Sequence, residues 1–344
     1  MSTPHRIQVA CCVVLMLATL GFVATGGLAL AETRASFRLW LYEQVEAVRG
    51  AGGDSRALPG AQAYARQRFG LRRYEPGAGW RDLADSPRPG RAVLLVHGLD
   101  EPGGIWRELA PALHAQGHAV MQIEYPNDQP IDASAAFLLA QLRELRAAGV
   151  ERVDLVTHSM GGLVARDALT REQGYGGAAA GHAELPDVAR LVMVAPPNHG
   201  SRWASLRGLL EVREQAAAML DGRWQPEELV VHGRGEAGDD LLPGSAYLGR
   251  LNGRALPRGL DMTIIAGRWL PERVLGRRVD PRLRDALGDG VVSLASTRLS
   301  GAGRRVRHVV LAGNHRGLLT GVGGVGGAAA VPAVVDHLAA PRRR

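Results

Sequence analysis

The chain has 344 residues, 46% of them hydrophobic, so it can bury a large core of mixed helices and strands. Its formal net charge is +7, and every basic residue other than histidine is an arginine. These arginines are spread along the chain and are not gathered with aromatic residues into one basic run, which argues against a dedicated nucleic-acid surface. The same charge remains compatible with an anionic membrane surface.

The first 31 residues predict an anchoring or targeting segment. Residues 7–31 form an uncharged stretch that is long enough to cross a bilayer. The small residues at positions 29–31 also suit signal-peptide cleavage. We therefore expect either a membrane-anchored protein, which the length of the apolar stretch favours, or an exported one. Because Cys11 and Cys12 both lie in this segment, the rest of the chain has no disulfide, thiol nucleophile or cysteine-based metal site.

Residues 32–90 are rich in arginine, glycine and proline and predict a connecting region, so we expect the folded domain to span residues 91–344. From Arg91 onward, apolar runs of strand length alternate with repeats of helical spacing. This alternation predicts an α/β domain with a mostly parallel sheet and helices on both faces. The expected strands are 92–96, 118–125, 153–156, 189–195, 262–266 and 307–311, and the expected helices include 105–115, 131–148 and 330–338.

A long insertion interrupts this alternation before the penultimate strand. Residues 200–260 contain a helical pattern at 206–220 and a polar, glycine-rich loop at 233–240. Insertions of this length between strands are usually functional. We therefore expect a lid or cap over a binding site, and an ordinary packed helix is the alternative.

Ser159 occupies the most informative position in the chain. The apolar run 153–156 has strand length, and helical spacing starts at Met160 with no loop between them. Such an abrupt strand-to-helix turn can present a serine hydroxyl above the end of a sheet. The following glycines fit a tight turn, whereas Thr157 stands where the pattern G-x-S-x-G has its first glycine. The motif alone is also compatible with a serine that caps a helix.

Two further residues complete a nucleophilic site in the expected chain order of serine, acid and histidine. Asp289 stands between two glycines after the penultimate expected strand, and His315 follows the last expected strand. A serine nucleophile needs such a histidine to take its proton and such a carboxylate to orient the histidine. Asp280, Asp285 and His308 are the alternatives. Asp280 and Asp285 lie in an arginine-rich stretch typical of surface ion pairs, and His308 lies within a strand.

A tetrahedral intermediate would also need two hydrogen-bond donors for its oxyanion. The residue after the nucleophile and the loop after the first core strand usually supply them. We therefore expect the backbone N–H groups of Met160 and Leu99 to be the donors. His97, His158 and His199 are expected to have supporting roles.

The segments HGL, THSMGG, APPNHGS, LLPGSAYLGRLN, GDGVVS and GNH together resemble α/β-hydrolase fold lipases and esterases of the bacterial triacylglycerol lipase type, from about Arg91 to the C-terminus. This resemblance implies Ser159 as nucleophile, with the acid, base and oxyanion roles at the positions given above. It implies no cofactor. Calcium-binding relatives carry an acidic ligand shortly after the catalytic histidine, where Arg316 stands here, so no metal is expected.

The expected activity is hydrolysis of carboxylic esters, of lipids or other acyl compounds, through an acyl-enzyme. An acyltransferase, thioesterase or amidase using the same triad is an alternative. A non-catalytic, membrane-tethered binding domain is an alternative from another class, because function belongs to the site and not to the fold.

Overall fold

Eight strands form one sheet in the computed structural model, which describes residues 69–83, 90–99, 104–127, 129–176, 184–201, 236–269, 281–299, 306–322 and 327–341. These residues belong to one compact unit of residues 67–204 and 236–344. The predicted leader 1–31 and the predicted lid helix 206–220 lie outside the described residues.

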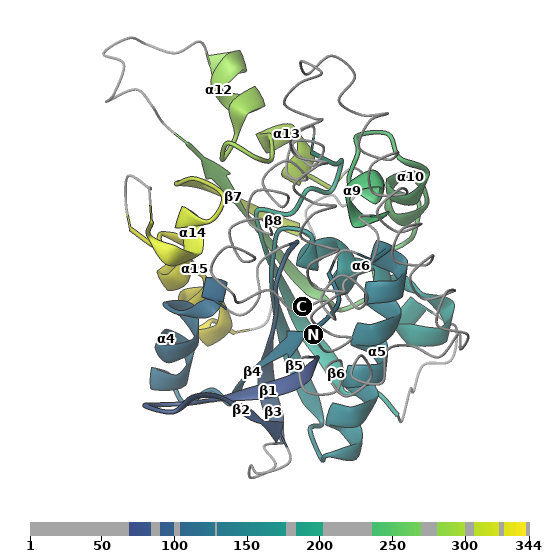
Figure 1. The fold of residues 1–344 in the computed structure, drawn as a ribbon, viewed down its shortest axis with the longest axis vertical. Coiled ribbons are helices and arrows are strands. Elements are labelled where there is room, and N and C mark those ends of the chain that lie inside the picture. The colour runs from purple at the N-terminus through teal and green to yellow at the C-terminus, as the bar shows by residue number, and fades with distance from the viewer. Residues whose placement is uncertain are drawn as a thin grey trace, which may run out of the picture. The chain divides into compact units, whose positions relative to one another are not determined.

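The sheet is mostly parallel, with the strand order β2-β1-β4-β3-β5-β6-β7-β8 (Figure 1). The strands from β3 to β8 pair in parallel, whereas β1 is antiparallel to both of its neighbours. The bounds are β1 Gly70–Glu75, β2 Gly79–Asp82, β3 Arg91–Val96, β4 Val120–Glu124, β5 Arg152–His158, β6 Asp187–Val194, β7 Asp261–Arg268 and β8 Val306–Ala312. The predicted α/β class with a mostly parallel sheet is therefore confirmed.

Helices cover both faces of the sheet because the central strands are apolar on both sides. Helices α5 (Ile131–Ala147) and α6 (Gly161–Thr170) pack on one face, where Leu94 and Leu155 belong to the same buried cluster as their side chains. Helices α4 (Leu109–Ala115) and α15 (Ala330–Ala339) pack on the other face against Val93 and Val192 (Figure 1). None of the helices in the described part of the chain is long and apolar enough to span a membrane.

We expected the fold to begin at Arg91, but the sheet begins earlier in the chain. Strands β1 and β2 come from residues 70–82, which the sequence analysis assigned to a connecting region. They form a hairpin at the edge of the sheet, and of β1 only Leu71 is fully buried. An edge hairpin that buries so little carries no apolar run, so its composition resembles that of a linker.

The second half of the predicted insertion packs into the core. Residues 236–260 include α9 (Glu236–Asp240) and α10 (Ala246–Asn252). Tyr247, Leu248 and Leu251 of α10 are buried in the cluster that contains α6, and the Tyr247 hydroxyl donates a hydrogen bond to Asp167 of α6. Of the predicted lid, residues 202–235 lie outside the described residues.

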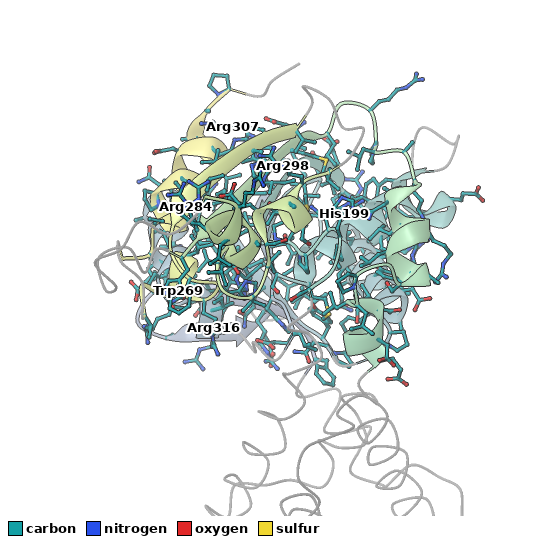
Figure 2. The ribbon with its side chains drawn as sticks, turned by 90° about the horizontal axis from the view of Figure 1, so that it is seen from above. His199, Trp269, Arg284, Arg298, Arg307 and Arg316 are labelled. Carbon is teal, nitrogen blue, oxygen red and sulfur yellow. The ribbon has the colours of Figure 1, made fainter. Side chains whose placement is uncertain are left out.

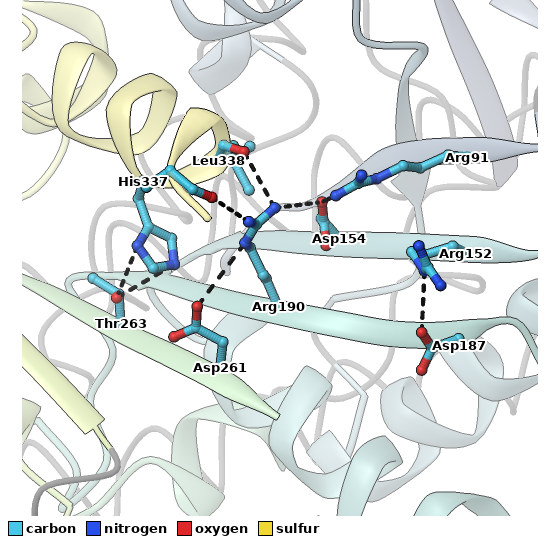
Figure 3. Close-up of polar contacts among 10 residues, drawn as sticks. Arg91, Arg152, Asp154, Asp187, Arg190, Asp261, Thr263, His337 and Leu338 are labelled. Atoms are coloured by element: carbon cyan, nitrogen blue, oxygen red, sulfur yellow. Dashed lines mark hydrogen bonds and ion pairs between the residues drawn. The ribbon is translucent and has the colours of Figure 1, made fainter. Parts of the chain in front are cut away.

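A buried ion network lies near the amino ends of the parallel strands (Figure 3). Arg190 of β6 lies 3.4 Å from the Asp154 carboxylate of β5 and 4.0 Å from that of Asp261 in β7. It also donates to the carbonyl oxygens of Leu338 and Ala340, at the end of α15. The network therefore attaches the last helix to the sheet, at the opposite end of the strands from Ser159.

Candidate active site

Ser159 lies between β5 and α6 with a left-handed backbone, at φ 52°. A positive φ is uncommon for a residue with a Cβ and is strained, so the surrounding structure must hold it. The Ser159 N–H donates to the Val194 carbonyl of β6, and the Ser159 carbonyl accepts from Gly162 N–H. Met160 is the N-cap of α6 and makes no side-chain cap bond. Ser159 is therefore the turning residue between β5 and α6, with the backbone geometry of a nucleophile elbow, and not a helix cap.

Close backbone contact explains the first glycine after the turn. A Cβ on Gly161 would lie 2.3 Å from the Val96 carbonyl oxygen and 2.5 Å from that of His97. The start of α6 thus lies directly against the end of β3. A mostly parallel eight-stranded sheet with helices on both faces and a serine at such an elbow is an α/β-hydrolase fold.

Thr157 replaces the first glycine of the elbow pattern without disturbing the turn. It is a regular residue of β5, paired with Val96 on one side and Met193 on the other. Its side chain is buried, and its hydroxyl lies 3.4 Å from the Val192 carbonyl oxygen. A β-branched side chain is accommodated because the position still belongs to the strand.

The structure brings Ser159, His315 and Asp289 into one hydrogen-bonded series. His315 Nε2 lies 2.9 Å from Ser159 Oγ, and His315 Nδ1 lies 2.8 Å from Asp289 Oδ2. All three residues are at most 5% exposed. A ring that donates from Nδ1 to a carboxylate presents an unprotonated Nε2 to the serine hydroxyl, so this arrangement can accept the serine proton.

Backbone groups hold the Asp289 carboxylate in place. Its second oxygen, Oδ1, accepts hydrogen bonds from the N–H groups of Val291 at 2.9 Å and Val292 at 2.7 Å. The Asp289 carbonyl accepts from His315 N–H, at 3.0 Å. A Cβ on Gly267, in β7, would lie 2.6 Å from Asp289 Cβ. A glycine is therefore needed there for the loop of residues 288–293, which contains Asp289 and which we term the acid loop, to approach the strand. Asp289 and His315 are therefore joined through the backbone as well as through their side chains.

His158, the last residue of β5, contacts His315. Its Nε2 lies 3.0 Å from the His315 carbonyl oxygen, and the two rings are 4.7 Å apart between centroids. Asp285 pairs instead with Arg268 at 3.0 Å. His308 Nε2 lies 2.9 Å from the Thr297 hydroxyl oxygen, and burial, together with the nearby charge of Arg298, lowers the pKa of His308.

A side-chain network that the sequence analysis missed supports the loop that contains Leu99. The Tyr125 hydroxyl donates to the His97 carbonyl oxygen at 2.7 Å, and its ring stacks on the His97 ring at 4.5 Å. The Gly98 carbonyl oxygen lies 2.8 Å from His97 Nδ1 and 3.4 Å from Asn127 Nδ2. Tyr125 and Asn127 follow β4, which neighbours β3, so their position after a strand was the available signal.

Within the described residues, no group of three or more His, Cys, Asp or Glu side chains lies where it could hold a metal ion. The roles of Ser159, Asp289 and His315, and those of Leu99 and Met160, stay predictions.

A family model described as a domain of unknown function, DUF7379, matches residues 64–219. The matched range includes Ser159 and ends before Asp289 and His315. A comparison with curated proteins found no match.

Several solved structures of lipases and phospholipases are similar to this chain. Bacillus licheniformis lipase BlEst2 in its mature form is 17% identical, over 73% of this chain and 93% of that one, with a TM-score of 0.47. Aspergillus fumigatus lipase B is 15% identical over 84% and 59%, with a TM-score of 0.49. Phospholipase PlaB from Legionella pneumophila is 21% identical over 61% and 46%, with a TM-score of 0.40. This chain spans only part of the length of Aspergillus fumigatus lipase B and of phospholipase PlaB. Its fold is defined by its own strand order and by the turn at Ser159.

Proposed function

We propose that this protein is a serine hydrolase that cleaves carboxylic esters through an acyl-enzyme intermediate. The observation that carries the proposal is the buried series from Ser159 Oγ through the His315 ring to Asp289, with hydrogen-bond distances of 2.9 and 2.8 Å. The strained elbow at Ser159 supports it, because strain of this kind is concentrated at functional sites.

In the first half of the reaction, Ser159 Oγ attacks the ester carbonyl carbon while its proton moves to His315 Nε2. The bond to the alcohol oxygen then breaks, and that oxygen takes the proton from His315. In the second half, water attacks the acyl-serine and gives a proton to the same nitrogen. Breaking the bond between serine and acyl group returns this proton to Oγ and releases the acid. Asp289 stays ionised and stabilises the imidazolium.

The backbone N–H groups of Met160 and Leu99 are the proposed oxyanion donors, each contributing about 3 kcal/mol to transition-state stabilisation. Two observations support them. Met160 is at the start of α6, where the helix dipole favours negative charge. The Leu99 N–H belongs to the same trans peptide as the Gly98 carbonyl, so the His97 and Asn127 contacts to that oxygen orient the N–H to the opposite side.

Labelling with a fluorophosphonate probe tests the proposal. We expect the wild-type protein to carry one covalent adduct, on Ser159, and to hydrolyse p-nitrophenyl butyrate. The Ser159→Ala variant should lose both the label and the hydrolysis. Ser134→Ala is the matched control, because Ser134 is also buried but bonds to the Pro126 carbonyl, outside the site. Turnover by Ser159→Ala at the wild-type rate would refute the nucleophile, and an unlabelled wild-type protein would favour the non-catalytic binding domain.

The class of ester and the acceptor are further proposals. Lipid or other acyl esters, the substrate class implied by the resemblance to bacterial triacylglycerol lipases, are the proposed substrates. An acyltransferase, thioesterase or amidase would use the same triad, because the triad does not depend on the leaving group. A panel of esters, thioesters and amides, assayed with and without an alcohol acceptor, distinguishes these activities.

Contact with an anionic membrane is also proposed. Trp269, Leu283 and Val322 are exposed by 44%, 55% and 65%, respectively. The Trp269 backbone N–H donates to the carbonyl oxygen of Gly288, the residue before Asp289. The Val322 carbonyl oxygen accepts a hydrogen bond from the side chain of Asn314, the residue before His315. Six arginines and two aspartates lie in the described residues between positions 262 and 322. Figure 2 shows Trp269, Arg284 and Arg316 on the same flank of the view from above. Apolar and cationic groups beside the site fit an anionic lipid surface.

The cellular location follows from the leader prediction. We propose that the protein is either anchored in a membrane by residues 1–31 or exported after their removal. N-terminal sequencing of the mature protein decides between these alternatives.

A further inference from the structure

The loop of residues 195–201 contains the segment PPNHGS and has no role in the proposed mechanism. Its backbone is nevertheless constrained and packs against several other segments. It begins at Ala195, which is buried and has a left-handed backbone at φ 53°. Two prolines follow, and their rings restrict φ. Gly200 also has a positive φ, and a Cβ there would lie 2.6 Å from the Leu241 carbonyl oxygen. This segment, which we term the bracket loop, is therefore strained and closely packed.

The bracket loop contacts the acid loop through a single peptide group. The Ser201 hydroxyl donates a hydrogen bond to the Val291 carbonyl oxygen at 2.5 Å. The N–H of the same peptide belongs to Val292 and donates to Asp289 Oδ1 at 2.7 Å. Ser201 thus orients the peptide that orients the carboxylate, and hydrogen bonds in such a series polarise one another.

Further hydrogen bonds attach the bracket loop to α13 (Leu294–Thr297). The Asn198 amide nitrogen donates to the Thr297 carbonyl oxygen at 2.8 Å, and the Ser296 hydroxyl donates to the Gly200 carbonyl oxygen at 2.6 Å. The His199 backbone N–H donates to the Ser296 carbonyl oxygen at 3.1 Å. The bracket loop is therefore joined to both ends of the segment from Val291 to Thr297.

The other side of the bracket loop is anchored to the helix that follows the nucleophile. Arg166 of α6 donates to the side-chain oxygens of Asn198 at 2.9 Å and Asn252 at 3.0 Å. Arg166 is 2% exposed, and burial lowers its pKa to about 10, so it remains charged at neutral pH. Both of these hydrogen bonds go to neutral amides. The nearby Asp167 carboxylate partly offsets the cost of burying this cation.

The Asn198 side chain can take only one orientation between these partners. Its oxygen faces a guanidinium, which has no acceptor, and its nitrogen faces a carbonyl oxygen, which has no donor. Asn198 therefore connects α6 to α13 directly. Asn252 strengthens the connection, because its amide nitrogen donates to the Asn198 carbonyl oxygen at 2.8 Å.

We propose that the bracket loop positions the acid Asp289 relative to the nucleophile Ser159, with Ser201 holding the Val291–Val292 peptide and Arg166 anchoring the loop through Asn198. These three are positioning residues, since they act through other groups. The proposal rests on the proposed function, because it requires Asp289 to orient His315. Misplacing a catalytic group by about 1 Å costs up to about a hundredfold in rate.

Three substitutions test the bracket loop in the full-length chain. Ser201→Ala removes the hydroxyl, whereas Ser201→Thr keeps it. Asn198→Asp is isosteric and keeps an acceptor for Arg166, but a carboxylate oxygen then faces the Thr297 carbonyl. We expect Ser201→Ala and Asn198→Asp each to lower kcat and the rate of fluorophosphonate labelling by about tenfold, with KM for a short soluble ester nearly unchanged, and Ser201→Thr to restore both.

Tyr175→Phe is the matched control, because it also deletes a hydrogen bond to a backbone carbonyl, that of Pro186, outside the bracket loop. We expect it to lower the melting temperature without changing the labelling rate per folded molecule. Wild-type kcat in folded Ser201→Ala and Asn198→Asp, or a rise in KM alone, would overturn the proposal. Absence of a label on Ser159 in the wild-type protein would instead refute the proposed function.

Discussion

Replacing Asp289 by asparagine keeps the size of the side chain and removes its charge. The substitution therefore tests whether the carboxylate orients the His315 ring. In the wild-type protein, Asp289 Oδ1 accepts two backbone N–H groups, and Oδ2 faces His315 Nδ1. Only the oxygen of an asparagine amide can accept those two hydrogen bonds, so its NH2 group must face the His315 ring. The ring would then carry its proton on Nε2, the nitrogen beside Ser159, and it could no longer take the serine proton.

The two N–H groups also set the size of this effect. An amide flipped into the productive orientation would lose both hydrogen bonds, at about 1–3 kcal/mol each. A total of about 2–6 kcal/mol leaves about one molecule in thirty to one in twenty thousand flipped, at about 1.4 kcal/mol per factor of ten. We therefore expect Asp289→Asn to lower kcat by about thirtyfold to twenty-thousandfold. The corresponding change in a serine protease costs roughly 10⁴-fold.

The assay is hydrolysis of p-nitrophenyl butyrate, with the near-UV circular dichroism spectrum as the check on folding. Asp285→Asn is the matched control, because Asp285 pairs with Arg268 in a half-exposed ion pair that we expect to contribute little. Its kcat should remain within about twofold of wild type. A folded Asp289→Asn protein that retains more than about a tenth of wild-type activity would refute this assignment of the acid.

Two further predictions concern the elbow and the membrane. Gly161→Ala brings a Cβ within 2.3 Å of the Val96 carbonyl oxygen, so it should lower the free energy of unfolding in urea by about 1–3 kcal/mol. Gly249→Ala, in α10 with nothing within 4 Å, should raise it by about 0.5–1 kcal/mol; equal effects would contradict the packing argument. Trp269→Ala should weaken binding to phosphatidylserine-rich vesicles about tenfold to a hundredfold in a sedimentation assay, because burying an aromatic side chain contributes about 1.5–3 kcal/mol. Equal wild-type binding to neutral phosphatidylcholine vesicles would count against the anionic surface.

The sequence was most informative where one local pattern changes into another. The apolar residues of β5 pass directly into the helical spacing of α6, and the glycines after Ser159 mark the turn between them. Asp289 follows β7 in the chain and His315 follows β8, so their place at the carboxyl end of a parallel sheet could be predicted. The Ser159 backbone strain could not, because φ depends on the contacts around the turn.

Composition does not reveal strands that bury few side chains. β1 and β2 contain charged residues, and their place in the sheet depends on pairing with β4 and not on an apolar run. The segment LLPGSAYLGRLN gave no local indication of its role either. Its Asn252 binds Arg166 and Asn198, which are 86 and 54 positions away in the chain.

The sequence by itself determined the class of the fold and the order in which serine, carboxylate and imidazole occur along the chain. Hydrophobic periodicity and turn glycines depend on residues that are close together in the chain, so both can be recognised in a single sequence. Only the tertiary structure decided that Ser201 meets the Val291 carbonyl, that Asn198 bridges α6 and α13, and that β1 extends the sheet. These contacts join residues that are distant in the chain, and they form only when the packed core brings their backbones together.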